Sequence, residues 1–355
     1  MNIIDTIKKA QEAYYNNEPI MTDVEFDALW DKAKEQYPNA DIFKTVGSDH
    51  TDGFVKSKHF IPMGSQNKAN TLEDMQKFFS KVDSTEVVAE YKCDGISVEL
   101  VYKDGLFVQA ITRGDGEYGD DITNNVSKMK GVPMLIKNNW TGSVRGEILL
   151  FKEDKEKYFP EAKNCRNMAS GISKRLDGSD SDKLTVVCYD ARPYGSEPFK
   201  NEIEVLSFLK VYGFIPVNGS TNTVWNAEKA MKYMEDTFKS YDSIPYDIDG
   251  IVFKQLLIDY DDQNANVRPN TNIALKPYNV EKVTKLIDIE WSMSNGTMTP
   301  VAVFEPVEID GATITRANMS NISQMIDMGV EIGKTIVVTR RNMVIPHVER
   351  VIVDI

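Results

Sequence analysis

Two strand-like runs joined by an Asp-Gly turn constrain the fold of this chain more than any other feature. The run ISVELVY (Ile96–Tyr102) and the run LFVQAIT (Leu106–Thr112) flank the tripeptide KDG, which contains Asp104 and Gly105. Asp-Gly between two alternating runs is typical of a tight β-hairpin. A hairpin is antiparallel, and helical stretches alternate irregularly with further strands on either side of it. The sequence therefore predicts an α+β domain with antiparallel sheets in the middle of the chain.

Flanking segments of different character extend the chain on both sides of this middle block. Residues 1–62 have apolar residues at helical spacing, and a second helix is expected after the N-cap residue Thr22. Residues 63–283 mix strands with helices, and residues 284–355 contain five short strands with one helical segment before the fourth. Five such strands are compatible with a closed barrel of the OB type, a fold that commonly binds nucleic acid. We expect a multidomain α+β chain: a small helical N-terminal domain, the middle domain and a C-terminal OB-fold β-barrel.

The composition narrows the classes of function without deciding among them. The chain has 3 cysteines and 3 histidines, all scattered, which excludes a four-cysteine zinc site and leaves hard cations such as Mg²⁺ as the expected metals. The net charge of −13 leans against nucleic acid, although a local basic stripe can coexist with an acidic remainder. We expect no membrane span, and the first residues do not read as a signal peptide, so the cytoplasm is the predicted location.

A lysine between two carboxylates is the most informative local pattern. Glu90, Lys92 and Asp94 are spaced two apart just before Gly95, so in an extended chain their side chains leave on one side. The ordinary interpretation of such a lysine is a surface ion pair. The apolar residues of VVAEY immediately before it favour a pocket instead, where a lysine can act as a nucleophile once its ammonium loses a proton.

Further charged residues stand at the edges of apolar strands in the same manner. Each by itself is usually a solvated residue. Taken together, they supply cations for phosphates and acids for a ribose or Mg²⁺, a set that suits nucleotidyl transfer. They are Arg113, Arg145, Glu147, Asp249, Lys254 and Lys276.

At these residues the chain resembles the NAD⁺-dependent DNA ligases over essentially its whole length. The Lys-x-Asp-Gly pattern by itself is shared with ATP-dependent ligases and capping enzymes, whereas the long glycine loop and the N-terminal block are specific. The last block resembles the OB domain of the family, including VVTRRNMVIPHVERV. The other matching segments are KCDG (Lys92–Gly95), TRGDGEYGDDITNNV (Thr112–Val126), VRGEI (Val144–Ile148), NCRNMASG (Asn164–Gly171), DGIVFK (Asp249–Lys254) and ALKP (Ala274–Pro277).

The resemblance implies a DNA ligase that seals nicked double-stranded DNA through an AMP adduct on Lys92. The lysine would take AMP from NAD⁺ and pass it to the 5′-phosphate of the nick, which the 3′-hydroxyl then attacks. Glu90 would contact adenine, and Asp94 would position the lysine. By the same resemblance, Arg113 and Glu147 would bind ribose and phosphate, and Lys254 and Lys276 would stabilise phosphate charge. Ser65 and Gln66 would contact the adenosine. Glu147 and Asp249 would hold Mg²⁺, or Asp249 would pair with the lysine.

The N-terminal helices correspond to the domain by which this family captures the nicotinamide half of NAD⁺. Asp23 and Asp27 match the two aspartates of the family. The chain departs from the family pattern at Phe26, where a tyrosine is usual, and at Tyr14–Tyr15, where the family has Tyr-His. It also has Lys174 where the family usually has an arginine, and a lysine cannot make a bidentate phosphate contact.

The family usually continues with a zinc finger, helix-hairpin-helix repeats and a BRCT domain, which follow nowhere in this sequence. A minimal phage-like ligase, a piece of a longer protein and one subunit of a two-chain enzyme all stay open. We expect self-adenylation to be intact and nick sealing by this chain alone to be weak or dependent on a second subunit.

Two other functions compete with this interpretation. A capping-type or RNA ligase would use ATP or GTP, but the aspartates of the N-terminal block have no use without a nicotinamide. A catalytically idle DNA-binding or scaffold subunit would have no physical reason to keep Lys92 and Lys254 in a desolvated pocket.

Overall fold

The structure, a computed structural model, separates the chain into two compact units. It describes residues 3–15, 21, 25, 26, 29, 32, 33, 36, 37, 53–82, 86–162, 164–220, 225–277, 281–294, 297–309, 312–319, 321–341 and 345–352. The first unit comprises Met1–Ala69, Glu73–Ala227 and Ile244–Leu275. The second comprises Asn70–Leu72, Glu228–Ser243 and Lys276–Ile355.

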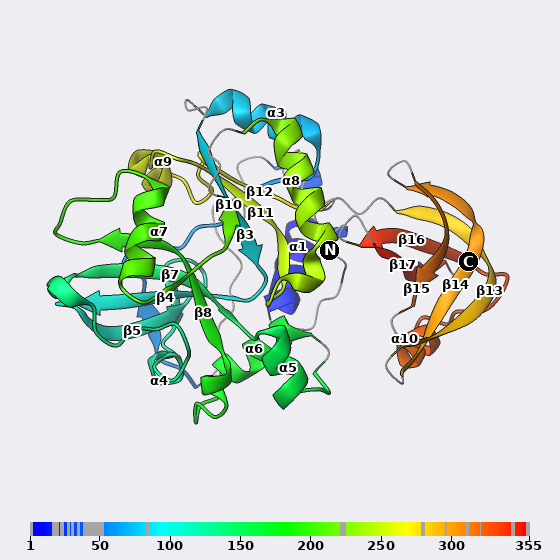
Figure 1. Cartoon of the computed structure of the whole chain (residues 1–355), viewed down its shortest axis with the longest axis horizontal. Coiled ribbons are helices and arrows are strands. Elements are labelled where there is room, and N and C mark those ends of the chain that lie inside the picture. The colour runs from blue at the N-terminus through cyan, green and yellow to red at the C-terminus, as the bar shows by residue number, and fades with distance from the viewer. Residues whose placement is uncertain are drawn as a thin grey trace. The chain divides into compact units, whose positions relative to one another are not determined.

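Helix α1 (Ile3–Tyr15) opens the chain, as the apolar spacing predicts (Figure 1). Ile7 is fully buried in a small cluster with Ala33, and four half-buried residues pack around them: Ile3, Ile4, Phe26 and Leu29. Of the second predicted helix the structure describes separate residues only, and those between 25 and 36 are helical.

The first sheet of the larger unit is built around strands β3 (Val87–Cys93) and β11 (Ile248–Gln255), which pair antiparallel. Its strand order is β10-β3-β11-β12-β2, with β12 and β2 parallel. The outer strands are β10 (Gly219–Ser220), β12 (Asn272–Leu275) and β2 (Asn67–Ala69). Two strands that are more than 150 residues apart in the sequence therefore lie side by side at the centre of this sheet.

The second sheet contains the predicted hairpin, β4 (Ile96–Lys103) and β5 (Leu106–Thr112). Asp104 and Gly105 turn the chain with positive φ angles of 51° and 82°, as a two-residue hairpin loop requires. The sheet order is β5-β4-β7-β8-β9, with β7 (Gly142–Leu149), β8 (Thr185–Pro193) and β9 (Ile215–Pro216). The alternation expected for a half-buried β4 is wrong in part, because Glu99 is buried along with its neighbours Val98 and Leu100.

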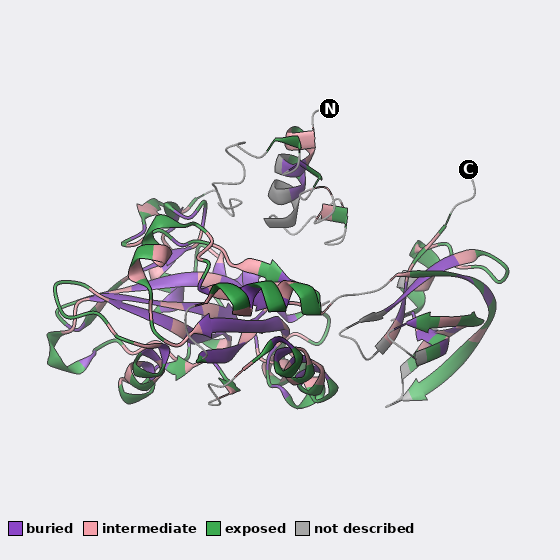
Figure 2. Ribbon diagram, turned by 90° about the horizontal axis from the view of Figure 1, so that it is seen from above, coloured by how far each residue is buried: buried purple, intermediate pink, exposed green. Residues whose placement is uncertain are grey.

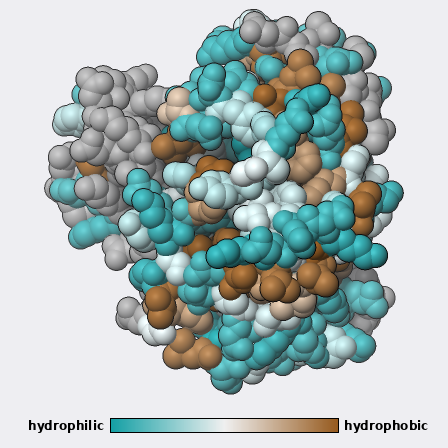
Figure 3. All heavy atoms as spheres, turned by 90° about the vertical axis from the view of Figure 1, so that its left-hand side faces the viewer, coloured by the Kyte–Doolittle hydropathy of each residue, from teal (hydrophilic) through white to brown (hydrophobic). Residues whose placement is uncertain are grey.

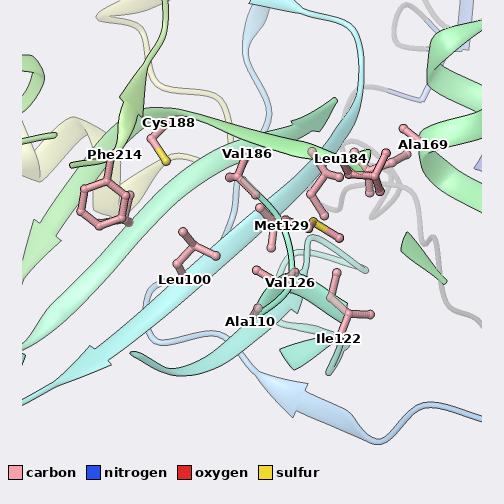
Figure 4. Close-up of a cluster of buried hydrophobic side chains, with 14 of the residues drawn as sticks. Leu100, Ala110, Ile122, Val126, Met129, Ala169, Leu184, Val186, Cys188 and Phe214 are labelled. Carbon is pink, nitrogen blue, oxygen red and sulfur yellow. The ribbon is translucent and has the colours of Figure 1, made fainter. Parts of the chain in front are cut away.

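The hydrophobic core of this unit lies between the second sheet and the helices that cover it. Leu100, Val186 and Phe214 point into it, together with Met129 and Val126 (Figure 4). Purple strands lie between green helices in Figure 2, so the sheets are buried and the helices face outward. On the face drawn in Figure 3 apolar residues form separate groups between polar ones.

Helices and a short strand pair complete the larger unit, whereas α8 after its first residue and the 3₁₀ turn at Tyr241–Ser243 group with the second unit. Asn164, Asn201 and Asp259 cap α6, α7 and α9, each accepting the amide three residues on at 2.7, 2.9 and 2.9 Å. The strand pair is β1 (Lys56–Lys58) with β6 (Tyr118–Asp120). The helices are α3 (Leu72–Lys81), α4 (Thr123–Val126), α5 (Lys152–Tyr158), α6 (Cys165–Ser173), α7 (Glu202–Val211), α8 (Ala227–Lys239) and α9 (Tyr260–Ala265), with 3₁₀ turns at Lys137–Asn139, Ser181–Lys183 and Tyr241–Ser243.

The predicted barrel is present in the second unit, where five strands close in the order β13-β14-β15-β17-β16. Leu286, Phe304 and Ile336 are among the side chains buried inside it. Its elements are β13 (Lys282–Ser294), β14 (Thr297–Ile309), β15 (Ala312–Asn318), α10 (Ile322–Asp327), β16 (Thr335–Arg341) and β17 (Ile345–Val351). The helix precedes the fourth strand, as expected. In the described parts of the chain, no helix is both long and apolar enough to cross a bilayer.

Candidate active site

Lys92 lies near the end of β3 and pairs with an acid on the neighbouring strand. Its Nζ is 2.8 Å from Oδ1 and 3.1 Å from Oδ2 of Asp249. The register places Gly250 opposite Lys92, and it shifts between Ile248 and Gly250, on either side of Asp249. About a quarter of each side chain of the ion pair is exposed, at 28% for Lys92 and 26% for Asp249. The lysine is therefore held in place and still reachable by a ligand.

The two acids beside Lys92 in the sequence have other partners in the structure. Asp94 accepts from Arg166 Nη1 at 2.8 Å, and its own amide donates to the carbonyl of Asp247 at 2.9 Å. Burial raises the pKa of the Asp94 carboxyl, and the nearby Arg166 opposes that effect without cancelling it. Gly95 follows where the chain passes from β3 to β4, and a Cβ there would lie 2.3 Å from the carbonyl oxygen of Ile148. The glycine of this motif is thus required by close packing.

Glu90 belongs to a buried charge cluster made by three elements. Its Oε2 is 2.7 Å from Nζ of Lys254 on β11, and Nζ also lies 3.3 Å from Oε2 of Glu202, the first residue of α7. The third neighbour of Nζ is the carbonyl oxygen of Tyr189, at 2.9 Å. All three charged side chains are at most 5% exposed. An ammonium has three N–H donors, so these three acceptors match the hydrogen-bonding capacity of Lys254.

Burial and charge act against each other in this cluster. Burial raises the pKa of Glu90 and raises that of Glu202 to about 7, although Lys254 lowers both. Burial by itself would lower the pKa of Lys254, but the carboxylates of Glu202 and Glu90 outweigh it and raise that pKa. The second carboxylate oxygen of Glu90, Oε1, is buried and has no hydrogen-bond partner among the described residues. An acceptor and a cation therefore stand side by side at one end of the site.

Aromatic and charged residues of β8 line the same region. The Tyr189 ring centroid is 5.9 Å from the Lys254 ammonium. Asp190 accepts from Arg192 Nε at 2.9 Å and lies 3.7 Å from a guanidinium nitrogen of Arg145. Burial by itself would raise the pKa of Asp190, but the two arginines lower it below its ordinary value.

Glu147, on β7, lies near enough to Lys92 for the ammonium to act on its carboxyl. Ser97 donates its hydroxyl to Glu147 Oε2 at 3.0 Å from the neighbouring strand β4, in direct register. Burial raises the pKa of the Glu147 carboxyl to about 7, although Lys92 and Arg166 lower it. A carboxyl with this pKa changes charge in the neutral pH range.

The glycine loop after β5 folds back on the segment that follows β1. Arg113 donates its amide to the carbonyl of Ser97 at 3.2 Å, and the turn is closed by a 3.0 Å bond from the Gly116 amide to the Arg113 carbonyl. Gly114 has φ +54°, and a Cβ on it would lie 1.9 Å from the carbonyl of Tyr118. The glycines of this loop are therefore required by its conformation, and the loop fixes the backbone of Arg113 beside β4.

Several other predicted site residues lie on further segments of the chain. Ser65 donates its amide to the carbonyl of Val267 at 2.8 Å, and Ser65 and Gln66 are half-buried just before β2. Lys276 lies just after β12, and Lys174 is the C-cap residue of α6. Tyr14 and Tyr15 are the last residues of α1, and their side chains lie outside the described part of the structure. Phe26 is half-buried, and Asp23 and Asp27 lie outside the described residues. The roles of these residues stay predictions.

The carboxylates of the site do not form a metal cage. Nowhere in the described ranges do three histidine, cysteine or acidic side chains gather as metal ligands. Asp249 pairs with Lys92, and Glu147 accepts from Ser97. Mg²⁺ is commonly held by one or two carboxylates and the phosphates of a substrate, and Glu147 and Asp249 fit that mode only.

Some site residues lay outside the sequence-based expectation. Arg166, Tyr189 and Glu202 contact the predicted residues but were not among them. NCRN contains Arg166 inside a matched motif, which is a usable signal. Asn201 and Glu204 form a helix-capping pattern that marks the start of α7, but nothing local shows that the intervening Glu202 is buried.

Comparison with known proteins places this geometry in a family. Residues 51–265 match the model of the NAD-dependent DNA ligase adenylation domain, and residues 283–355 match that of the NAD-dependent DNA ligase OB-fold domain. The chain belongs to the NAD-dependent DNA ligases. It contains the adenylation nucleotidyltransferase domain and the OB-fold domain of that family.

Relatives of this ligase chain include proteins named DNA ligase from three bacteria. The Treponema denticola protein is 40% identical over 365 residues, which cover 98% of this chain and 56% of that protein. The Treponema pallidum protein is 35% identical and the Sorangium cellulosum protein 34%, over 96% and 99% of this chain and 43% and 56% of those proteins. The chain spans about half the length of the curated relatives it matches. The predicted domain boundaries at 62/63 and 283/284 stay predictions.

Proposed function

We propose that this chain self-adenylates on Lys92 with NAD⁺, transfers the AMP to the 5′-phosphate of a nick and catalyses sealing by the 3′-hydroxyl. The single observation that carries the proposal is the pairing at Lys92. Among the described residues its ammonium forms an ion pair with Asp249, while Glu90 and Asp94 are engaged by Lys254 and Arg166. The lysine thus has one carboxylate beside it, partly exposed, in a site otherwise arranged for a nucleotide.

The first step would form one bond and break another at the α-phosphorus. The ammonium of Lys92 must lose a proton before it can attack, and the Asp249 carboxylate at 2.8 Å is in position to accept it. The Nζ–P bond forms, the P–O bond to nicotinamide mononucleotide breaks, and that mononucleotide leaves. An oxygen of the nick 5′-phosphate then displaces Lys92 from the adenylate phosphorus. The 3′-hydroxyl finally attacks the 5′-phosphorus, and AMP departs.

The buried cluster would recognise the base. Adenine presents an amino donor beside a ring nitrogen acceptor on one edge. Glu90 Oε1 lacks a partner among the described residues, and the ammonium of Lys254 lies next to the same carboxylate. An unpartnered acceptor matches the amino donor of that edge, so we assign Glu90 to adenine. Lys254, whose three N–H donors are already engaged, holds that carboxylate in place. This assignment places Lys254 at the base end of the site, away from the phosphate role that the sequence resemblance implies.

The remaining roles follow the family resemblance. Arg113, Glu147 and Lys276 would serve the ribose and phosphates, with Ser65 and Gln66 beside the adenosine. Tyr14, Phe26, Asp23 and Asp27 would capture the nicotinamide half. Mg²⁺, held by Asp249 or Glu147 and the phosphates, would neutralise phosphate charge. Nicked DNA would be the substrate, and no comparison supports a second subunit.

Intact-protein mass after incubation with Mg²⁺ and either NAD⁺ or ATP tests the proposal, on protein first stripped of AMP. The wild type should gain one AMP with NAD⁺ only, and Lys92→Ala should gain none. Lys103→Ala, which removes an exposed lysine from the end of the adjacent strand β4, is the matched control and should behave as wild type. A gain with ATP would instead place the chain with ATP-dependent ligases, and no gain with either would favour the idle subunit.

Nick sealing is measured separately, because the chain spans about half of its relatives. Pre-adenylated protein is mixed with a nicked duplex at physiological salt and the joined strand is counted. We expect slow sealing by this chain alone. Fast sealing would contradict that expectation and leave the adenylation proposal intact.

A further inference from the structure

A buried histidine–glutamate pair lies beside the nucleotide site and takes no part in the chemistry proposed above. His59 Nδ1 is 2.7 Å from Oε2 of Glu99, and both side chains are completely buried. The other ring nitrogen, Nε2, is 3.0 Å from the carbonyl oxygen of Arg113. The ring therefore joins strand β4 to the glycine loop that holds Arg113.

The surroundings of the ring define where its protons are. A backbone carbonyl can only accept, so Nε2 must carry a hydrogen to bond Arg113. If Nδ1 were then bare and Glu99 ionised, a lone pair would face a carboxylate at 2.7 Å. The pair must hold one further proton, either on Nδ1 or on Glu99. The second oxygen of Glu99, Oε1, is buried and has no hydrogen-bond partner in the described ranges.

Other hydrogen bonds around the pair join the segment 59–62 to strand β4, to the glycine loop and to strand β7. The Phe60 amide donates to Glu99 Oε2 at 3.2 Å, and the His59 amide donates to the carbonyl of Glu117 in the loop at 2.8 Å. Arg145, which lies opposite Glu99 on β7, donates to the carbonyls of Ile61 and Pro62 at 2.8 and 3.0 Å. Among these side chains, the ring of His59 contacts the backbone of Arg113, whose guanidinium is expected to bind the nucleotide.

We propose that His59, held by Glu99, is a positioning residue for Arg113 in self-adenylation. The Arg113 backbone is fixed at both ends, by its amide to Ser97 and by its carbonyl to the histidine ring and the Gly116 amide. Fixing both ends restricts the directions in which its side chain can extend over the site. This role rests on the proposed function, because it supposes that Arg113 contacts NAD⁺.

Two variants separate the contacts of the ring. The amide nitrogen of asparagine overlays Nδ1 of histidine, and that of glutamine overlays Nε2. His59→Asn thus keeps the bond to Glu99 and loses the bond to Arg113, whereas His59→Gln does the reverse. We expect His59→Asn to lower the rate of AMP gain at limiting NAD⁺ about tenfold, the upper range for one hydrogen bond, and His59→Gln to lower it less. Glu99→Gln can donate from its amide nitrogen to a neutral ring but can no longer accept from Phe60 at that position, so it should keep more of the rate than His59→Asn does.

A double variant tests whether the histidine acts through Arg113. In an Arg113→Ala background, His59→Asn should cause no further loss. A full additional tenfold loss, or equal losses in His59→Asn and His59→Gln, would overturn the positioning role in favour of general packing. Thermal melting of each variant shows whether it is folded.

A measurement on the wild type keeps the inference testable should the buried variants unfold. The chain has 3 histidines, so ¹⁵N-labelled ring signals are few, and a single His59 variant assigns them. We expect a hydrogen on Nε2 of His59, and a bare Nε2 would refute the proposed contact. This result does not depend on activity: a wild type that gains no AMP would defeat the proposed function while the ring state still reports on the contact.

Discussion

Glu202→Gln tests whether burial or the neighbouring ammonium controls the acid at the start of α7. Glu202 is 3% exposed and 3.3 Å from Lys254, so burial and attraction act on it in opposite directions. If burial prevails, as a pKa of about 7 indicates, the folded chain holds the proton more tightly than the unfolded chain, whose value is 4.5. The group's contribution to stability is then fully present below pH 4.5 and is lost as the pH rises through about 7.

The magnitude follows from the two pKa values. Raising the pKa of one carboxyl from 4.5 to about 7 corresponds to about 3 kcal/mol lost from the free energy of unfolding between pH 4 and pH 8. Glutamine has the same shape, does not titrate and can still accept from Lys254. The free energy of unfolding of Glu202→Gln should therefore rise relative to that of the wild type, by up to about 3 kcal/mol, between pH 4 and pH 8.

The assay must report on the adenylation domain by itself, since a chain of several domains need not unfold in one step. Protein is equilibrated in urea at each pH, then pulse-labelled with deuterium at one fixed pH, and peptides of β3 and β11 give the unfolded fraction. Glu204→Gln, at an exposed position of the same helix, is the matched control. A flat difference between pH 4 and pH 8 would refute the reasoning, and a difference of opposite slope would show that Lys254 prevails over burial.

Other variants test the rest of the site. Asp249→Asn should slow AMP gain on Lys92 by about a hundredfold, which is the lower range for losing a positioned proton acceptor. The melting temperature should not change, and an unchanged rate would exclude Asp249 as that acceptor. Burial raises the pKa of Glu147 to about 7, so AMP gain, if it needs the Glu147 carboxylate, should accelerate from pH 6 to pH 8. Glu147→Gln should remove that rise, and a pH–rate profile identical to that of the wild type would contradict this role. Gly114→Ala should destabilise the domain by about 1–3 kcal/mol, because a Cβ at φ +54° would meet the carbonyl of Tyr118. Gly171→Ala, where a Cβ meets nothing within 4 Å, should not destabilise it. Equal melting temperatures of the two variants would argue against the strained turn.

Local patterns were sufficient for much of the fold. Asp104 and Gly105 predicted the hairpin because few residues other than glycine, asparagine and aspartate adopt the positive φ angles that a two-residue loop needs. The barrel strands were predicted with a helix before the fourth, as observed. The expected alternation of β4 failed at Glu99, because both faces of that strand are covered and His59 provides a partner for the buried acid.

The site was predicted mainly as a set of residues, with Asp249 as a partner of the lysine the one contact named between them. Lys92 and Asp249 were each expected in the site, and the structure pairs them. Glu90 and Asp94 were expected on one side of the lysine, yet they bind Lys254 and Arg166. Glu202 was not expected, since a glutamate at the first turn of a helix is ordinarily solvated.

The sequence by itself determined where strands turn, which residues could carry charge into an apolar setting, and the family to which their order belongs. Only the tertiary structure decided which acid pairs with which cation, that Glu202 and Glu99 are buried, and that His59 reaches Arg113. The physical reason is that spacing along a strand sets only the side on which a residue leaves the backbone. Its partner and its loss of water depend on segments far away in the chain, such as β3 and β11, which folding brings into register.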